Sequence, residues 1–292
     1  MYFLGMLMTT FRSIEEYFQI CAMADRRQDS SAQPEHELIS LKMSPYSLTA
    51  RWALRHCGVP FTVTPYEPVV GELGLRLRLW RYTSRPRDVK KVTVPILLVR
   101  NAATKQHVAL RSTLEIATYA HTLSEIHQHF FHDADSVNAW DARYQRMLAY
   151  VRGQLMSDVR ANSDLTMEYA PPFLRKHMPT LARWFATIGV GVFTRKYAVE
   201  SAATSIDHIR ETLALMQSIL STQRYLVGDE FTYADLAMAV AIDHIAPGPH
   251  STIHGKRKDL MLKRNITTGF EDVVAWKDRI YDQFYGTDEK HS

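Results

Sequence analysis

One stretch, residues 38–58, constrains the fold more than any other part of the chain. It reads LISLKMSPYSLTARWALRHCG, in which an apolar-rich run, Leu38–Met43, meets a serine-proline pair and then a helical pattern. Ser44 suits the N-cap of that helix, and Pro45 suits its first turn, where a missing N–H costs nothing. Gly58 suits the position just after the helix, where the backbone turns left-handed. The sequence therefore predicts a strand that leads into a helix N-terminus, a place where an anion can be held.

The regions that follow divide the chain into an α/β part and a helical part. Strands are predicted at 61–66, 92–99 and 107–110, and a helix begins after Ser112. From about Ser136 onward the spacing of apolar residues is helical only. Strand–helix–strand followed by strand–strand–helix is typical of a small layered α/β domain, here followed by helices.

These patterns set the expected domain boundaries. We expect an N-terminal extension at residues 1–35, an α/β domain at 36–124 and an all-helical domain at 135–286. Within the α/β domain, a helix in the basic stretch 71–91 would have Leu73, Leu77 and Trp80 on one face.

The composition excludes several classes of protein. Hydrophobic residues make up 46% and charged residues 23% of the 292 residues, the ordinary range of a globular protein. No apolar run reaches the roughly 18 residues that span a membrane. The net charge of +4 is small for the length, so we do not expect a nucleic-acid-binding protein. No basic residue precedes Arg12, which argues against a secretory signal. The two cysteines suit a reducing compartment, so we expect a cytoplasmic protein.

Four motifs follow one another along the chain. They are Ser44–Ser47 (SPYS), Val94–Leu97 (VPIL), Leu110–Ser112 (LRS) before a helix through Tyr119, and Leu226–Asp235 (LVGDEFTYAD). In this order and spacing they resemble the motifs of the cytosolic glutathione S-transferase family over roughly residues 37–285. The resemblance implies a thioredoxin-like α/β N-terminal domain followed by an all-α C-terminal domain, which is the glutathione S-transferase fold.

The resemblance also implies roles for residues of the first three motifs. Ser44 would hydrogen-bond the sulfur of glutathione, the co-substrate. Val94, between Thr93 and a cis-Pro95, would pair through its backbone with the cysteinyl residue of glutathione. Ser112, at a helix N-terminus, would donate to the γ-glutamyl carboxylate.

The fourth motif is structural by resemblance and by its own spacing. Thr232 suits the N-cap of a helix, and Asp235, three residues later, suits the reciprocal acid of a capping box. Residues 236–242 are apolar on all sides, which predicts a central, buried helix.

Ser44 is open to two interpretations. A hydroxyl donor beside a helix N-terminus favours a thiolate, whose parent thiol ordinarily has a pKa of about 8.5. The alternative is that Ser44 only caps its helix, with Ser47 as a second candidate for the sulfur contact. Cys57 falls late in the helix and is expected in the core, so thiol–disulfide exchange through this turn is not expected.

Two positions depart from the family pattern. Arg111 stands where most members carry an acid or amide that accepts from the γ-glutamyl ammonium, and an arginine cannot accept and repels that ammonium. Thr93 stands where a lysine or glutamine is frequent. Either the ammonium is met elsewhere, or glutathione binds weakly, or the ligand is another anion.

The resulting functional hypothesis is a dimeric glutathione transferase. It would let the glutathione thiolate attack a small hydrophobic electrophile bound against the helical domain. The alternative is a non-catalytic binding or assembly protein with the same fold. Glutathione-dependent isomerisation or dehalogenation would use the same site.

Three further clusters have plain structural explanations beside functional ones. The basic stretch 76–91 is either a solvated face or a feature that steers an anion. A histidine- and aspartate-rich connection (His127, His129, His132, Asp133 and Asp135) lacks fixed zinc spacing, so we expect no metal there. An aromatic set could line a second-substrate pocket or belong to the core; its members are Tyr144, Tyr150, Met167, Tyr169 and Phe173.

Overall fold

The structure is a computed structural model of the chain. It describes residues 35–66, 71–80, 82, 92–101, 106–125, 128–168, 170, 172–202 and 205–285. The expected N-terminal extension and most of the basic stretch after Trp80 lie outside the described residues.

The first part of the chain forms a four-stranded sheet in the order β2-β1-β3-β4. The strands are β1 (Glu35–Ser40), β2 (Thr62–Pro65), β3 (Ile96–Asn101) and β4 (Gln106–Leu110). Strand β1 runs parallel to β2 and antiparallel to β3, which is antiparallel to β4.

Strands β1 and β3 depart most from the expected boundaries. Strand β1 ends at Ser40 rather than at Met43, because the Ser44 N–H donates to the Leu41 carbonyl at 3.0 Å and closes a turn. Strand β3 begins at Ile96 rather than at Val92, after a cis peptide bond that precedes Pro95.

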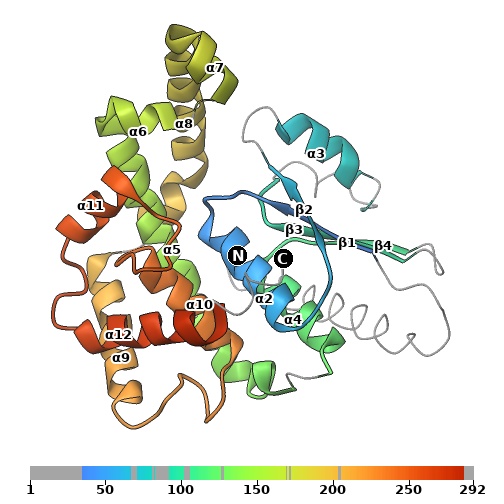
Figure 1. Ribbon diagram of the computed structural model, residues 1–292, viewed down its shortest axis with the longest axis vertical. Helices are drawn as coiled ribbons and strands as arrows, with labels where there is room; N and C mark the ends of the chain where they lie inside the picture. Colours follow the sequence, from blue (N-terminus) through green and yellow to red (C-terminus); the bar gives the residue numbers. More distant parts are fainter. Residues whose placement is uncertain are drawn as a thin grey trace, which may run out of the picture.

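Helices cover both faces of the sheet. Helices α2 (Pro45–His56) and α4 (Thr113–Leu123) lie on the face toward the helical domain, and α3 (Gly71–Leu79) lies on the other face (Figure 1). Because side chains alternate along a strand, Leu38 joins the core under α2 and α4, whereas its neighbour Ile39 packs under α3.

Helix α3 has the expected position but buries a different face. Leu75 and Leu79 are buried against the sheet, whereas Leu77 and Trp80 are 61% and 69% exposed. The leucines of this helix recur at every second position, so the sequence offers two possible faces, and the pair spaced by four residues is the one that meets the core.

The remainder of the described chain is helical, as expected. Its elements are η3 (Gln128–Phe131), α5 (Ala134–Ala161), α6 (Ser163–Glu168), α7 (Pro172–His177), α8 (Pro179–Ala202), α9 (Ile206–Leu220), α10 (Tyr233–Asp243), α11 (Gly255–Lys263), α12 (Glu271–Ile280) and η4 (Tyr281–Tyr285). Every residue of α10 is buried, which confirms the predicted central helix. None of the helices in the described parts of the chain is long and apolar enough to cross a membrane.

The predicted capping box starts α10. The Asp235 carboxylate accepts from the backbone N–H of Leu226 at 2.8 Å and from the backbone N–H and hydroxyl of Thr232 at 2.9 and 2.8 Å. Burial raises the pKa of Asp235 to about 6, against these hydrogen bonds, which lower it. The carboxylate therefore ties the preceding loop to the first turn of the central helix.

A second buried polar network fastens α12 to α10. The Lys277 ammonium is fully buried, lies 2.6 Å from an Asp278 carboxylate oxygen and 3.6 Å from one of Asp243, and donates to the Ala246 carbonyl at 3.1 Å. A Cβ on Gly248 would collide with Lys277 Nζ and Asp278 Oδ1, so the loop after α10 passes close over this network.

We expect Lys277→Met to lower the free energy of unfolding by about 3 kcal/mol, because the Asp243 carboxylate stays buried without its cation. Denaturant unfolding of the full chain measures this change. Lys263→Met, at an exposed position of α11, is the control and should change stability by less than about 0.5 kcal/mol. Equal effects of the two substitutions would show that the buried ion pair contributes nothing.

Candidate active site

The turn at the start of α2 has the geometry that the sequence predicts. Ser44 is the N-cap, with extended backbone angles, and its hydroxyl oxygen accepts from the Ser47 N–H at 3.4 Å. Pro45 opens the helix, and Gly58 follows it with a positive φ of 68°. A hydroxyl has one donor as well as two acceptor positions, so Ser44 can cap the helix and donate to a ligand at the same time.

The two serines of the turn differ in availability. Ser44 is half-buried, whereas Ser47 is fully buried and its hydroxyl oxygen accepts from the Leu41 N–H at 3.1 Å. Ser47 thus holds the strand-to-helix turn in place, and Ser44 is the serine that faces the outside of the turn.

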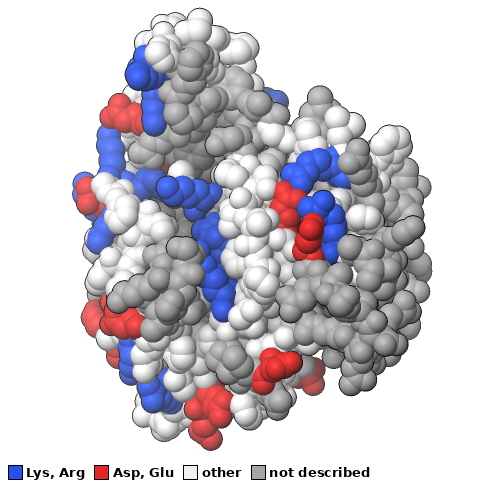
Figure 2. Space-filling model, turned by 45° about the vertical axis from the view of Figure 1, so that its right-hand side comes forward, with Lys and Arg blue, Asp and Glu red and all other residues white. Residues whose placement is uncertain are grey.

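The surroundings of Ser44 favour a negative charge. The first turn of α2 carries no acidic residue that would neutralise its N-terminus. Arg152 of α5 donates to the Tyr46 hydroxyl at 2.6 Å and lies 5.1 Å from the centre of the tyrosine ring. Arg51 of α2 donates to the Ser40 hydroxyl at 2.5 Å. Figure 2 shows Lys and Arg side chains running down the middle of one face of the molecule.

The second expected element is the bond before Pro95. The Val94–Pro95 peptide is cis, as the resemblance implies. Val94 is half-buried and Thr93 is exposed, and both precede the paired residues of β3, which begin at Ile96. The Val94 backbone therefore lies outside the strand ladder, in a position to pair with an extended peptide.

The third element is the start of α4, where the structure adds a residue that the sequence reasoning missed. Ser112 is the N-cap, and its hydroxyl accepts from the Glu115 N–H at 3.1 Å. In return, the Glu115 carboxylate accepts from the backbone N–H groups of Arg111 and Ser112 at 2.7 and 3.1 Å. The Ser-x-x-Glu spacing of a capping box was the signal for this acid. One carboxylate thus already occupies the helix terminus expected to receive the γ-glutamyl carboxylate.

The strand register brings these three elements to one edge of the sheet. Ile39, near the end of β1, pairs with Ile96 at the start of β3, and Leu97 pairs with Leu110 at the end of β4. The segments that carry Ser44, Val94 and Ser112 therefore leave the sheet at the same end. Thr232 and Asp235 belong to the helical domain and hold its central helix.

The helical domain supplies a wall beside the α2 turn. The Tyr46 ring lies edge-on to Tyr144 of α5, with ring centres 5.7 Å apart, and the Tyr144 hydroxyl lies 2.9 Å from the Thr49 hydroxyl of α2. The α2 turn is thus fixed to α5 of the helical domain.

The described members of the aromatic set proposed for a pocket lie in two separate clusters. Tyr144 is fully buried in the main core, where Tyr150 packs against the same core, whereas Met167 belongs to a separate small cluster. Tyr169 and the side chain of Phe173 lie outside the described part of the structure.

The remaining candidates have structural roles. Cys57 is buried, and burial raises its pKa to about 12, which makes it a core residue as expected. Asp133 caps α5 by accepting from the Ser136 N–H at 3.2 Å, and His129 lies 3.7 Å from the Glu230 carboxylate. Within the described ranges no group of three or more His, Cys, Asp or Glu side chains could hold a metal ion, and His127 lies outside those ranges.

A thioredoxin-like α/β domain followed by an all-helical domain, with a cis-proline beside a capped helix N-terminus, defines the glutathione S-transferase fold. Comparison with known proteins agrees: residues 190–283 match the family described as glutathione S-transferase, C-terminal domain. The chain therefore has the glutathione S-transferase fold, and its residues 190–283 match the C-terminal domain of that family.

Similar solved structures support the same fold. Glutathione transferase F7 from Populus trichocarpa is 16% identical, with 87% of this chain and 98% of that chain covered and a TM-score of 0.54. Poplar glutathione transferase F1 is 14% identical, with 89% of this chain and 98% of that chain covered and a TM-score of 0.51. NaGST-2 is also 14% identical, with 86% of this chain and 93% of that chain covered and a TM-score of 0.51. No curated protein sequence matches the chain.

Proposed function

We propose that the protein is a glutathione transferase, which joins the sulfur of glutathione to a small hydrophobic electrophile. The observation that carries this proposal is the convergence of Ser44, Val94 and Ser112 at one end of the sheet, beside a helix N-terminus that no acid neutralises. We also propose that it acts in the cytoplasm as a homodimer.

In the proposed reaction, Ser44 acts on the thiol of glutathione. Its hydroxyl donates a hydrogen bond to the sulfur and, together with the N-terminus of α2, stabilises the thiolate over the thiol, whose proton passes to solvent water. The thiolate then gives its electron pair to the electrophilic carbon and a carbon–sulfur bond forms. A leaving group, where the electrophile carries one, departs with the electrons of the bond that breaks. Serine itself stays protonated throughout.

The backbone of glutathione would be held by the other two elements. Val94 would pair with the cysteinyl residue as one strand pairs with another. For the γ-glutamyl ammonium we propose Glu115, whose carboxylate lies 2.7 Å from the backbone nitrogen of Arg111. This acid would take the place of the acceptor that the arginine does not provide.

Arg111→Gln should tighten glutathione binding by about tenfold. The substitution removes a positive charge near the ammonium and introduces an amide acceptor, each contributing about 0.7 kcal/mol. Calorimetric titration of glutathione into the wild type and the variant measures the change.

Glu115→Gln is the matched test of the proposed acceptor. Glutamine can still complete the capping box, so the fold should keep its stability while glutathione binding weakens. Unchanged affinity in both Arg111→Gln and Glu115→Gln would place the γ-glutamyl group elsewhere.

A single assay tests the enzyme proposal as a whole. The purified chain should be retained on glutathione-agarose and should conjugate glutathione to a generic aromatic electrophile. A chain that neither binds nor conjugates would contradict the proposal.

The second candidate is a non-catalytic binding protein with the same fold, and the start of α4 favours it. There Arg111 is a cation where glutathione needs an acceptor, and the helix terminus that would receive the γ-glutamyl carboxylate is already bound by the Glu115 carboxylate. Under this alternative the site holds another anion at the N-terminus of α2, and conjugation is absent although the fold is intact.

A further inference from the structure

Helix α8 exposes an apolar face directly opposite the face it buries. Ala182, Ala186 and Val190 recur every four residues and are buried against neighbouring helices. On the opposite side, Leu181, Trp184 and Ile188 are 40%, 62% and 45% exposed, and Met178, just before the helix, is 49% exposed. An exposed tryptophan within a row of aliphatic side chains is typical of a docking surface.

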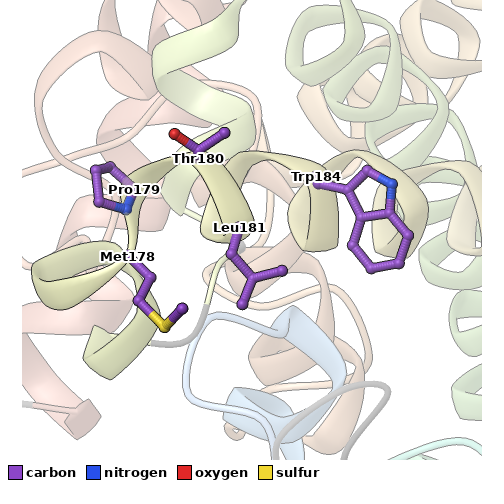
Figure 3. A pocket seen from close by; sticks show the side chains of 5 residues that line it. All are labelled: Met178, Pro179, Thr180, Leu181 and Trp184. Atoms are coloured by element: carbon purple, nitrogen blue, oxygen red, sulfur yellow. The ribbon is translucent and has the colours of Figure 1, made fainter.

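This face begins at an extremity of the molecule. Helix α7 and the start of α8 form the end of the helical domain that projects farthest along the long axis (Figure 1). A shallow hollow there is lined by Met178, Pro179, Thr180, Leu181 and Trp184. In Figure 3 Met178 and Leu181 point to the same side of the helix, and Thr180 points to the other. We call α7 together with residues 178–188 the α7–α8 tip.

The segment that forms the α7–α8 tip carries charge of one sign. Residues 169–199 contain no aspartate or glutamate but five cationic residues. Those whose side chains are described, namely Arg175, Lys176, Arg183 and Arg195, are all exposed. The tip therefore combines exposed apolar side chains with a positive charge that no acid in this segment offsets.

We propose that the α7–α8 tip docks on the surface of an anionic phospholipid bilayer. Trp184, Leu181 and Met178 would enter the headgroup region, and the flanking Arg and Lys side chains would meet the negative lipid headgroups. The cytoplasmic leaflet carries such lipids. The protein would then act at a membrane surface, where hydrophobic electrophiles concentrate, without spanning the membrane.

Two observations favour a bilayer over a second copy of the chain. A symmetric contact through this tip would place the cations of one copy against the same cations of the other, which is repulsive. A projecting end also reaches a flat surface without interference from the rest of the molecule. The proposal does not depend on glutathione binding and can succeed or fail independently of it.

The test is sedimentation of the full chain with vesicles of phosphatidylcholine, with and without phosphatidylserine. We expect at least tenfold stronger binding to the vesicles with phosphatidylserine, and a loss of that binding at high salt. Trp184→Ala and the charge reversal Arg183→Glu should each weaken binding at least fivefold with unchanged thermal unfolding, because both side chains are exposed. The matched control is Trp80→Ala, just after α3, where a similarly exposed tryptophan lies outside the tip; this variant should bind as the wild type does.

Three outcomes would overturn the proposal. The first is equal sedimentation with both kinds of vesicle. The second is an equal loss of binding in Trp80→Ala and Trp184→Ala. The third is dimerisation in solution that Trp184→Ala abolishes, because a second copy of the chain would then cover this face.

Discussion

Ser44→Ala is expected to lower the rate of glutathione conjugation by about 100-fold. The proposed role of Ser44 is to donate a hydrogen bond to the sulfur as its charge develops, and loss of one such donor typically costs two to three orders of magnitude. The loss should appear chiefly as a raised pKa of bound glutathione, measured from the pH dependence of thiolate absorbance. Helix capping contributes only about 1 kcal/mol of stability, so the variant should remain folded.

Ser47→Ala is the matched control for this experiment. It removes the other hydroxyl of the same turn, whose bond to the Leu41 N–H holds the backbone. It should destabilise the chain yet leave the thiol pKa of bound glutathione close to the wild-type value. If Ser44→Ala conjugates at the wild-type rate, Ser44 only caps its helix. If Ser47→Ala alone raises the thiol pKa, the roles of the two serines are reversed.

Asp235→Ala should lower the free energy of unfolding by about 4 kcal/mol, the largest stability effect that we expect. The carboxylate is fully buried, and its removal leaves the backbone N–H groups of Leu226 and Thr232 without partners in the core. Each unpaired buried donor costs about 1–3 kcal/mol. Denaturant unfolding of the full chain measures the loss, and Asp229→Ala, in the exposed part of the same loop, is the control.

The same residue makes stability depend on pH in a definite direction. Its folded-state pKa of about 6 lies above the ordinary value, so the folded state binds more protons than the unfolded state between about pH 4 and 6. The contribution of Asp235 to stability therefore falls as pH rises through this window. Asp235→Asn, which cannot ionise, should lack this slope, and an identical pH profile in wild type and variant would contradict the assignment.

Local backbone chemistry made much of the fold predictable from the sequence. Three helix starts were marked by residues that form hydrogen bonds within a few positions of one another: Ser44 with Pro45, Ser112 alone, and Thr232 with Asp235. The structure forms all of these caps. Signals of this kind depend on neighbouring residues only, so they can be read without tertiary information.

Tertiary packing decided what the sequence left ambiguous. Leucines at every second position of α3 allow two buried faces, and only the sheet selects Leu75 and Leu79 over Leu77. The sequence likewise did not show which aromatic residues of the helical domain would lie in the core. The structure shows that Tyr144 does. Exposure of Trp184 was unpredictable for the same reason, because an apolar residue in a helix is ordinarily expected to be buried.

For the candidate site, the sequence identified the residues that form it, but not the distant residues that contact them. It placed Ser44, the cis-Pro95 bond and Ser112 in segments that the strand register brings to one end of the sheet. It did not identify the cation beside the site, because Arg152 is far from Tyr46 in the chain and meets it only through the packing of α5 on α2.

Calorimetric titration of glutathione into the protein at neutral pH tests the central claim most directly. The account predicts saturable binding to one site per chain, with a Kd of about 1 mM or tighter for the wild type and about tenfold tighter for Arg111→Gln. Absence of saturable heat in both proteins, with each folded by thermal unfolding, would contradict the claim that this fold holds glutathione.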